Sequence, residues 1–199
     1  MDFDLSEEQR AIQALCREFA RDEVAPRAEE MDRNEEFPYE LVRKMAELGL
    51  MGLPFPEKYG GAGADTVSYA LAVMEIARVD ASTAITLAAH VSLGATPLLL
   101  FGTEAQKERY LVPLARGEKL WGFGLTEPGA GSDAGGTRTR AVLRDGTWVI
   151  NGTKAFITNS GTDITAGTTI TAVTGEHNGR SEISNIIVPQ ETPGFTRSK

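Results

Sequence analysis

The sequence holds few of the residues that build disulfide frameworks and metal sites. Among 199 residues there are one cysteine, Cys16, and two histidines, His90 and His177. A single cysteine excludes an internal disulfide framework, and two histidines argue against a multi-histidine metal site, so we predict no metal. Cys16 lies among apolar residues at helical spacing, which favours a buried structural thiol over a nucleophile. A lone histidine in an apolar tract is more often a hydrogen-bonded structural residue than a catalyst, and we expect this of His90.

Long uninterrupted apolar runs are also absent. The most apolar tract, residues 84–100, has five interruptions: Thr86, His90, Ser92, Thr96 and Pro97. This pattern predicts a buried helix with a break, and no membrane span. The acidic N-terminus has neither the basic region nor the apolar region of a signal peptide. We therefore expect a soluble intracellular protein, in the cytoplasm.

Positive charge is scarce as well, and its distribution is informative. The net charge is -8, with 41% hydrophobic and 24% charged residues, as in a soluble globular protein. Residues 1–60 hold 15 acidic groups against 8 basic ones, and the remainder holds 13 against 12. This balance argues against nucleic acid as a partner and is compatible with an anionic ligand in the later part of the chain.

Residues 1–118 predict an N-terminal all-helical domain. Ser6 and Gln9 have the spacing of a capping box, as do Thr103 and Gln106. After the first box, apolar residues recur at the spacing of one amphipathic helix face, up to Phe19. Pro26 is expected to kink or end this first helix.

Residues 119–199 predict a small antiparallel β domain, barrel or sandwich, so the fold class is α+β. A hairpin turn is indicated at residues 144–146, and a further strand at residues 153–158. Strands that follow helices without βαβ alternation argue against a dinucleotide-binding Rossmann domain. Residues 165–171 are rich in Thr and Gly, which predicts looser packing there.

Trp121–Asp133 joins the two halves and is the most informative stretch. It begins as an apolar strand and breaks at Pro128 into a turn with closely spaced glycines and the hydroxyls of Thr126 and Ser132. Such a strand and loop suit a flat cofactor with a phosphate tail; a strand and turn without a ligand is the alternative. Phe156–Thr158 would add an aromatic face and a hydroxyl that suit an isoalloxazine ring. The alternative there is an ordinary core aromatic beside surface threonines.

Two motifs that follow the helical half of the chain resemble those of acyl-CoA dehydrogenases. They are L-T-E-P-G-A-G-S-D at Leu125–Asp133 and N-G-T-K-A-F-I-T-N at Asn151–Asn159. The similarity extends through nearly the whole chain, including F-D-L-S-E-E-Q-R at Phe3–Arg10 and F-G-T-E-A-Q-K-E-R-Y-L at Phe101–Leu111. It implies that the helical and middle β domains bind FAD, and it leaves open whether the β domain is complete at its C-terminal end.

The resemblance also implies roles for single residues. Phe123, Leu125 and Thr126 would contact the edge of the flavin. Gly131 and Ser132 would lie at the pyrophosphate, with Ser132 also near the acyl-CoA. Phe156, Ile157 and Thr158 would cover the ring, with Thr158 near N5, and Phe156 stands where many relatives have Trp.

The implied reaction is α,β-dehydrogenation of an acyl-CoA to the trans-2-enoyl-CoA in fatty-acid β-oxidation. Electrons would pass to an electron-transfer flavoprotein, and the parent protein would be a homotetramer. In the family the base is a glutamate of a C-terminal helical domain that this sequence does not include. No catalytic residue is therefore assigned, and Glu127 is interpreted as a turn residue. The isolated chain is expected to be inactive. Two alternatives stay open: a non-catalytic or incomplete flavin- and acyl-CoA-binding module that needs a further domain or partner chain, and a related flavin oxidase.

Overall fold

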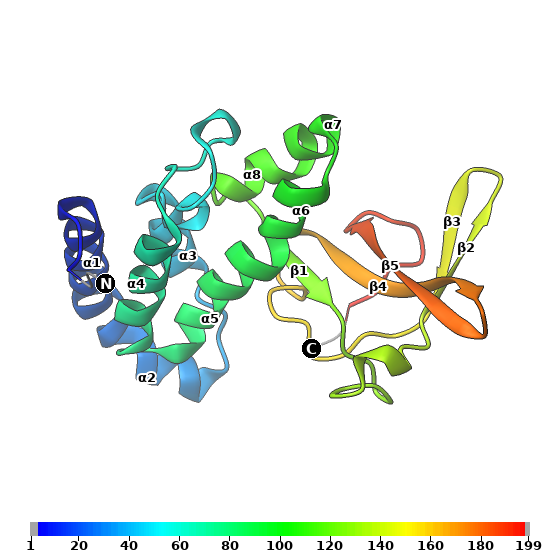
Figure 1. Ribbon diagram of the computed structural model, residues 1–199. Helices are drawn as coiled ribbons and strands as arrows, with labels where there is room; N and C mark the ends of the chain where they lie inside the picture. Colours follow the sequence, from blue (N-terminus) through cyan, green and yellow to red (C-terminus); the bar gives the residue numbers. More distant parts are fainter. Residues whose placement is uncertain (1–3, 198–199) are drawn as a thin grey trace. The chain divides into compact units, whose positions relative to one another are not determined.

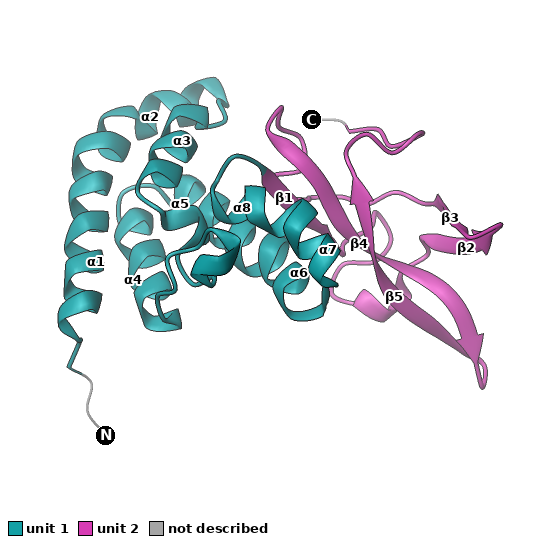
Figure 2. Ribbon diagram, turned by 90° about the horizontal axis from the view of Figure 1, so that it is seen from above, with its two compact units in different colours: residues 1–119 teal, residues 120–199 magenta. Residues whose placement is uncertain are grey.

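The computed structural model describes residues 4–197, and the chain divides into two compact units. The first comprises Met1–Lys119 and the second Leu120–Lys199 (Figure 2). The first unit is helical and the second is built on a β-sheet. The prediction of an α+β fold, with helices preceding strands, is confirmed.

The first unit is made of helices that in several places continue into one another. Its α-helices are α1 (Glu7–Phe19), α2 (Ala25–Asn34), α3 (Tyr39–Glu47), α4 (Thr66–Ala77), α5 (Ala81–Ala89), α6 (Thr96–Phe101), α7 (Glu104–Gln106) and α8 (Val112–Ala115). Short 3-10 turns lie at Leu50–Gly52 and Glu57–Tyr59. Three π-helical turns, Ala20–Val24, His90–Ala95 and Lys107–Leu111, join α1 to α2, α5 to α6, and α7 to α8. Figure 1 shows α1 and α4 side by side.

Local capping signals were predicted correctly, and of the two effects expected of Pro26, a kink or an end of the helix, the end is not seen. Both capping boxes are present: Ser6 with Gln9 at the start of α1, and Thr103 with Gln106 at the start of α7. The helix does not end at Pro26, because α1 passes through a π-helical turn into α2. Pro26 lies in the first turn of α2, directly after the π-helical turn, whose altered hydrogen-bond spacing lets the helix continue past a residue without a backbone N–H.

Ala81–Phe101 forms one continuous helix through α5, the π-helical turn and α6. The predicted break is therefore wrong, because the extra residue of the π-helical turn keeps the chain helical. Within residues 4–197 it is the one helix whose length of 21 residues and mean hydropathy of 1.7 would suffice to cross a membrane. Half of its apolar window is buried within the protein, and the core helix of a soluble protein has the same properties.

The two rarest side chains of the first unit are structural. Cys16 is fully buried, and desolvation, with a smaller contribution from the charge of Glu75, raises the pKa of its thiol to about 12. Such a thiol is unreactive, as predicted. His90 is also fully buried, and its Nε2 donates a hydrogen bond of 3.0 Å to the carbonyl oxygen of Leu114. His90 thereby links the long helix to α8.

The burial of His90 predicts a loss of stability in mild acid. Burial lowers its pKa from 6.5 to about 4, against the opposing effect of the hydrogen bond to Leu114. Between these values the unfolded chain binds a proton that the folded chain does not, so unfolding is favoured as the pH falls. The stabilisation that depends on His90 being neutral is fully present above pH 6.5 and is lost toward pH 4. It amounts to ~3 kcal/mol of the free energy of unfolding.

Urea unfolding of the wild type and of His90→Gln between pH 4 and pH 7.5 measures this effect. The difference between the two free energies of unfolding should change with pH in that window. His177→Gln, at the other histidine of the chain and in an exposed position, is the matched control. A pH-independent difference between wild type and His90→Gln would refute the assignment.

The second unit is an open, mixed sheet. Its strands are β1 (Leu120–Gly124), β2 (Arg140–Arg144), β3 (Thr147–Asn151), β4 (Thr165–His177) and β5 (Arg180–Pro189). The order is β1-β4-β2-β3, with β5 also paired to β4. β1 and β2 run parallel to β4, whereas the β2–β3 and β4–β5 pairs are antiparallel. The expected antiparallel barrel or sandwich is therefore wrong in detail, because β4 takes parallel partners and the described strands form no closed barrel.

The strand β4 is the centre of this unit, and Figure 1 shows it as a long ribbon with β5. Its four threonines within residues 165–171 are buried, against the expectation of loose packing there. Trp121, fully buried in β1, donates from Nε1 to the hydroxyl oxygen of Thr169 at 3.0 Å. Gly167 leaves room for the indole, since a Cβ there would lie 2.5 Å from the ring. The Thr and Gly residues thus fit a tryptophan that an aliphatic strand would exclude.

Candidate functional site

The first candidate segment runs from β1 into a tight turn. In β1 Trp121 is fully buried, and Phe123, two residues later, is half-buried. The chain then leaves the sheet at Leu125 and Thr126 and closes a turn in which the backbones of Glu127 and Ala130 exchange hydrogen bonds of 2.9 and 3.1 Å. This turn carries the chain to Gly131 and Ser132, both of which are exposed.

The second candidate segment, after β3, is not the strand that was predicted for residues 153–158. Gly152 to Ser160 has no ladder pairing. Phe156 and Asn159 have φ angles of 57° and 65°, in the left-handed region, which breaks the two-residue alternation of a strand. Phe156 and Thr158 therefore do not share the face of a strand. The ring of Phe156 is 94% exposed, and Thr158 is exposed as well.

The two segments nevertheless come together. The backbone N–H of Ala155 donates to the carbonyl oxygen of Thr126 at 2.8 Å. Ile157 packs against Gly122 of β1, where an added Cβ would lie 3.1 Å from the Ile157 Cγ2. Residues on both sides of this contact were singled out from the sequence. Their proximity is a feature of the fold.

A buried ion pair lies directly behind the contact. Lys154 Nζ donates to Glu127 Oε1 at 2.8 Å, and the two side chains are 9% and 6% exposed. The carboxylate also accepts from the backbone N–H of Arg138 at 2.7 Å, from that of Thr139 at 3.0 Å, and from the Thr137 hydroxyl. Glu127 lies in a turn, as predicted, but its side chain is a buried hydrogen-bond acceptor.

The surroundings of Glu127 decide its chemistry. Burial alone would raise the pKa of the carboxyl group. The hydrogen bonds from Lys154, Thr137, Thr139 and Arg138 outweigh burial and hold the pKa well below its usual value of 4.5. A carboxylate with so low a pKa stays ionised and is a poor proton acceptor. Glu127 is therefore a structural carboxylate.

Lys154 was not selected from the sequence, although it lies inside the second motif, Asn151–Asn159. Its role depends on Glu127, 27 positions earlier, and on Thr171, 17 positions later. One available signal was a lone cation between the small and apolar residues of the second motif. Such a residue is expected to be paired when it is buried.

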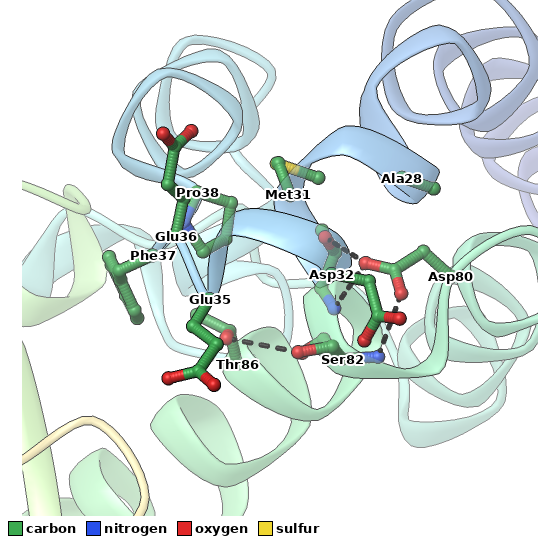
Figure 3. A pocket seen from close by; sticks show the side chains of 11 residues that line it. Ala28, Met31, Asp32, Glu35, Glu36, Phe37, Pro38, Asp80, Ser82 and Thr86 are labelled. Atoms are coloured by element: carbon green, nitrogen blue, oxygen red, sulfur yellow. Dashed lines mark hydrogen bonds between the residues drawn. The ribbon is translucent and has the colours of Figure 1, made fainter.

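A pocket in the first unit has no residues in common with the candidate segments. It has a volume of about 330 Å³ and lies between the end of α2 and the start of α5 (Figure 3). Its lining includes four carboxylates: Asp32, Glu35, Glu36 and Asp80. The Asp80 carboxylate caps α5 through the backbone N–H groups of Ser82 and Thr83. Among residues 4–197 no three His, Cys, Asp or Glu side chains are grouped to hold a metal ion.

Comparison with known proteins gives the same family for both units. The family model for "Acyl-CoA dehydrogenase, N-terminal domain" matches residues 6–118, and that for "Acyl-CoA dehydrogenase, middle domain" matches residues 122–199. The probable acyl-CoA dehydrogenase YngJ of Bacillus subtilis (strain 168) is 53% identical over 197 residues, which are 98% of this chain and 51% of that protein.

Solved structures agree. Butyryl-CoA dehydrogenase of Megasphaera elsdenii superposes with a TM-score of 0.92 at 46% identity, over 98% of this chain and 52% of that one. A structure described as the electron transferring flavoprotein of Acidaminococcus fermentans superposes with a TM-score of 0.93 at 45% identity, over 100% of this chain and 52% of that one. An acyl-CoA dehydrogenase of Bacillus anthracis complexed with FAD superposes with a TM-score of 0.88 at 40% identity, over 98% of this chain and 33% of that one. The chain thus spans about half the length, or less, of the relatives it matches.

Proposed function

Because the chain belongs to the acyl-CoA dehydrogenase family, we propose that it provides the flavin-binding side of an active site that dehydrogenates an acyl-CoA thioester. The observation that carries the proposal is the meeting of the two candidate segments at Ala155 and Thr126. Next to this contact the ring of Phe156 is 94% exposed with a positive φ. A bulky residue in that conformation is unusual and points to a functional constraint.

The residues of the two segments fit FAD. Phe156 offers an aromatic face for the isoalloxazine ring, and Thr158 and Ser132 offer exposed hydroxyls. Open space surrounds Gly129 and Gly131, since a Cβ at either would meet no atom within 4 Å. Backbone amides next to such glycines can approach a pyrophosphate closely. These features support a flavin at Phe156–Thr158 with its phosphates toward Gly131 and Ser132.

The roles of the protein groups follow from the family reaction. FAD, when bound, supplies the acceptor for the hydride that leaves the β carbon. Phe123, Leu125 and Thr126 would hold one edge of the ring, and Ile157 and Thr158 the other side, with the Thr158 hydroxyl directed to N5. Ser132 would also contact the acyl-CoA. A carboxylate base for the α proton would come from outside these 199 residues, in a protein of the relatives' length.

We propose the substrate and the partners from the named relatives and from the family resemblance. The structural relative from Megasphaera elsdenii is named for butyryl-CoA, which supports a fatty acyl-CoA as substrate. Passage of electrons to an electron-transfer flavoprotein is supported by the similarity to the Acidaminococcus protein. A homotetramer is proposed for the complete protein from the family resemblance.

Flavin binding is the direct test. The purified chain, titrated with FAD, should bind about one flavin per chain and release intact FAD on acid precipitation. Phe156→Ala should weaken binding about tenfold, or ~1.4 kcal/mol, because the ring loses its stacking partner. Phe101→Ala, at another phenylalanine that is 83% exposed, is the matched control and should leave the affinity unchanged. Release of NAD, or no binding after reconstitution with FAD, would contradict the proposal.

A further inference from the structure

Lys154 makes more contacts than an ion pair requires. Its ammonium lies 2.8 Å from Glu127 Oε1, 2.9 Å from the hydroxyl of Thr171, 3.0 Å from that of Thr137 and 3.1 Å from the carbonyl oxygen of Leu125. An ammonium has three N–H donors, so its hydrogen-bonding capacity is fully used by these acceptors. The acceptors come from three separate parts of the second unit: the first motif, the segment at Thr137, and β4.

Two hydrogen bonds, one from the Lys154 side chain and one from the next residue, join Leu125 and Thr126 to the second candidate segment. Lys154 reaches the carbonyl oxygen of Leu125 through its side chain, and the next residue, Ala155, reaches the carbonyl oxygen of Thr126 through its N–H at 2.8 Å. Consecutive residues of one segment are thus tied to consecutive residues of the other. Phe156 is the residue that follows these two hydrogen-bonded positions in the chain.

From this geometry we propose that Lys154 is a positioning residue for the flavin, fixing the spacing between Leu125–Thr126 and Phe156–Thr158. The inference rests on the proposed flavin site. Lys154 itself is 9% exposed and would not touch the ring. It acts through the segments, because groups that grip opposite sides of a rigid planar ligand must be held to within about 0.5 Å.

The charge of Glu127 explains why a lysine is used. The carboxylate is buried and needs a cation, and the same ammonium can also bind neutral oxygens of the turn and of β4. Removal of Lys154 alone would leave a buried, uncompensated charge, which is destabilising in itself. A test must therefore separate loss of stability from loss of positioning.

The test compares three variants of the chain. Lys154→Met removes the ammonium but keeps a similar side-chain length. The double variant Glu127→Gln/Lys154→Met removes both charges and still lacks the links to Leu125 and Thr171. Lys119→Met, at an exposed lysine just before β1, is the control for the exchange itself. The measurements are the FAD dissociation constant, the thermal midpoint, and hydrogen exchange of the Ala155 amide without FAD.

We expect Lys154→Met to raise the FAD dissociation constant at least about tenfold and to accelerate exchange at Ala155. The double variant should recover much of the thermal midpoint but keep the weak affinity and the fast exchange. If Lys154→Met does not fold, the double variant carries the same comparison with Lys119→Met. Recovery of affinity together with the midpoint in the double variant would overturn the inference, since the pair would then be only structural.

Failure of the inference can be told from failure of the proposed function. If the wild-type chain binds no FAD, the proposed function fails, and exchange at Ala155 still reports on the link between the segments. Unchanged exchange in both Lys154 variants would overturn the positioning role whether or not flavin binds. Normal FAD binding by the wild type with unchanged affinity in the variants would overturn it as well.

Discussion

The 199-residue chain, assayed alone, is expected to give no turnover with any acyl-CoA. Removal of the α proton needs a carboxylate within hydrogen-bonding reach of the substrate carbon. Glu127, the glutamate of the first motif, is buried against Lys154 and its pKa is held low, so it cannot serve. The chain covers about half of its relatives, and we expect the base to lie in the other half.

The assay uses saturating FAD, acyl-CoAs of short, medium and long chain, and a dye as electron acceptor. A full-length family member assayed in parallel shows that the conditions support turnover. Turnover by the chain itself would show that a base lies within these residues. In that case Asp133→Asn, which removes the exposed carboxylate at the end of the first motif, would tell whether Asp133 is that base.

Trp121→Ala is expected to destabilise the second unit by about 3–5 kcal/mol, as large-to-small substitutions of buried aromatics do. The indole is fully buried, and its removal would empty the space next to Gly167. The hydroxyl of Thr169 would also lose the N–H that it accepts. Because β1 leads directly into the first candidate segment, FAD affinity should fall in parallel.

The other tryptophan of the chain provides the control. Trp148, in β3, is 43% exposed, and Trp148→Ala should change the free energy of unfolding by less than about 1 kcal/mol. Each variant keeps one tryptophan, so urea unfolding can be followed by fluorescence and compared with circular dichroism. Equal losses in the two variants would contradict the assignment of Trp121 as the core of the sheet.

Features that depend on neighbouring residues were predictable. The capping boxes at Ser6 and Thr103 need only the residue three positions later. The hairpin between β2 and β3 turns at Asp145 and Gly146, which both have positive φ, as a tight two-residue turn requires. In each case the interacting groups lie within a few positions of one another in the sequence.

Features that depend on distant partners were not predictable. Residues 153–158 follow a predicted turn and were expected to form a strand, yet Lys154 and Ala155 hydrogen-bond to Leu125 and Thr126 and the segment has no ladder pairing. The parallel pairing of β1 with β4 likewise leaves no local trace. The candidate segments were found from their motifs, whereas the ion pair behind them became visible only in the fold.

The pairing of β1 with β4 has a consequence for biosynthesis. Leu120 pairs with Thr165 and Gly124 with Ile170, so the strand that carries the first motif is made some 45 positions before its partner. Contacts this far apart in sequence form late, because a long loop must close first. While the ribosome adds the intervening residues, Trp121 has no sheet to enter. This half of the molecule therefore depends on a late closing event, and the nascent chain is open to chaperone binding or aggregation until β4 has emerged.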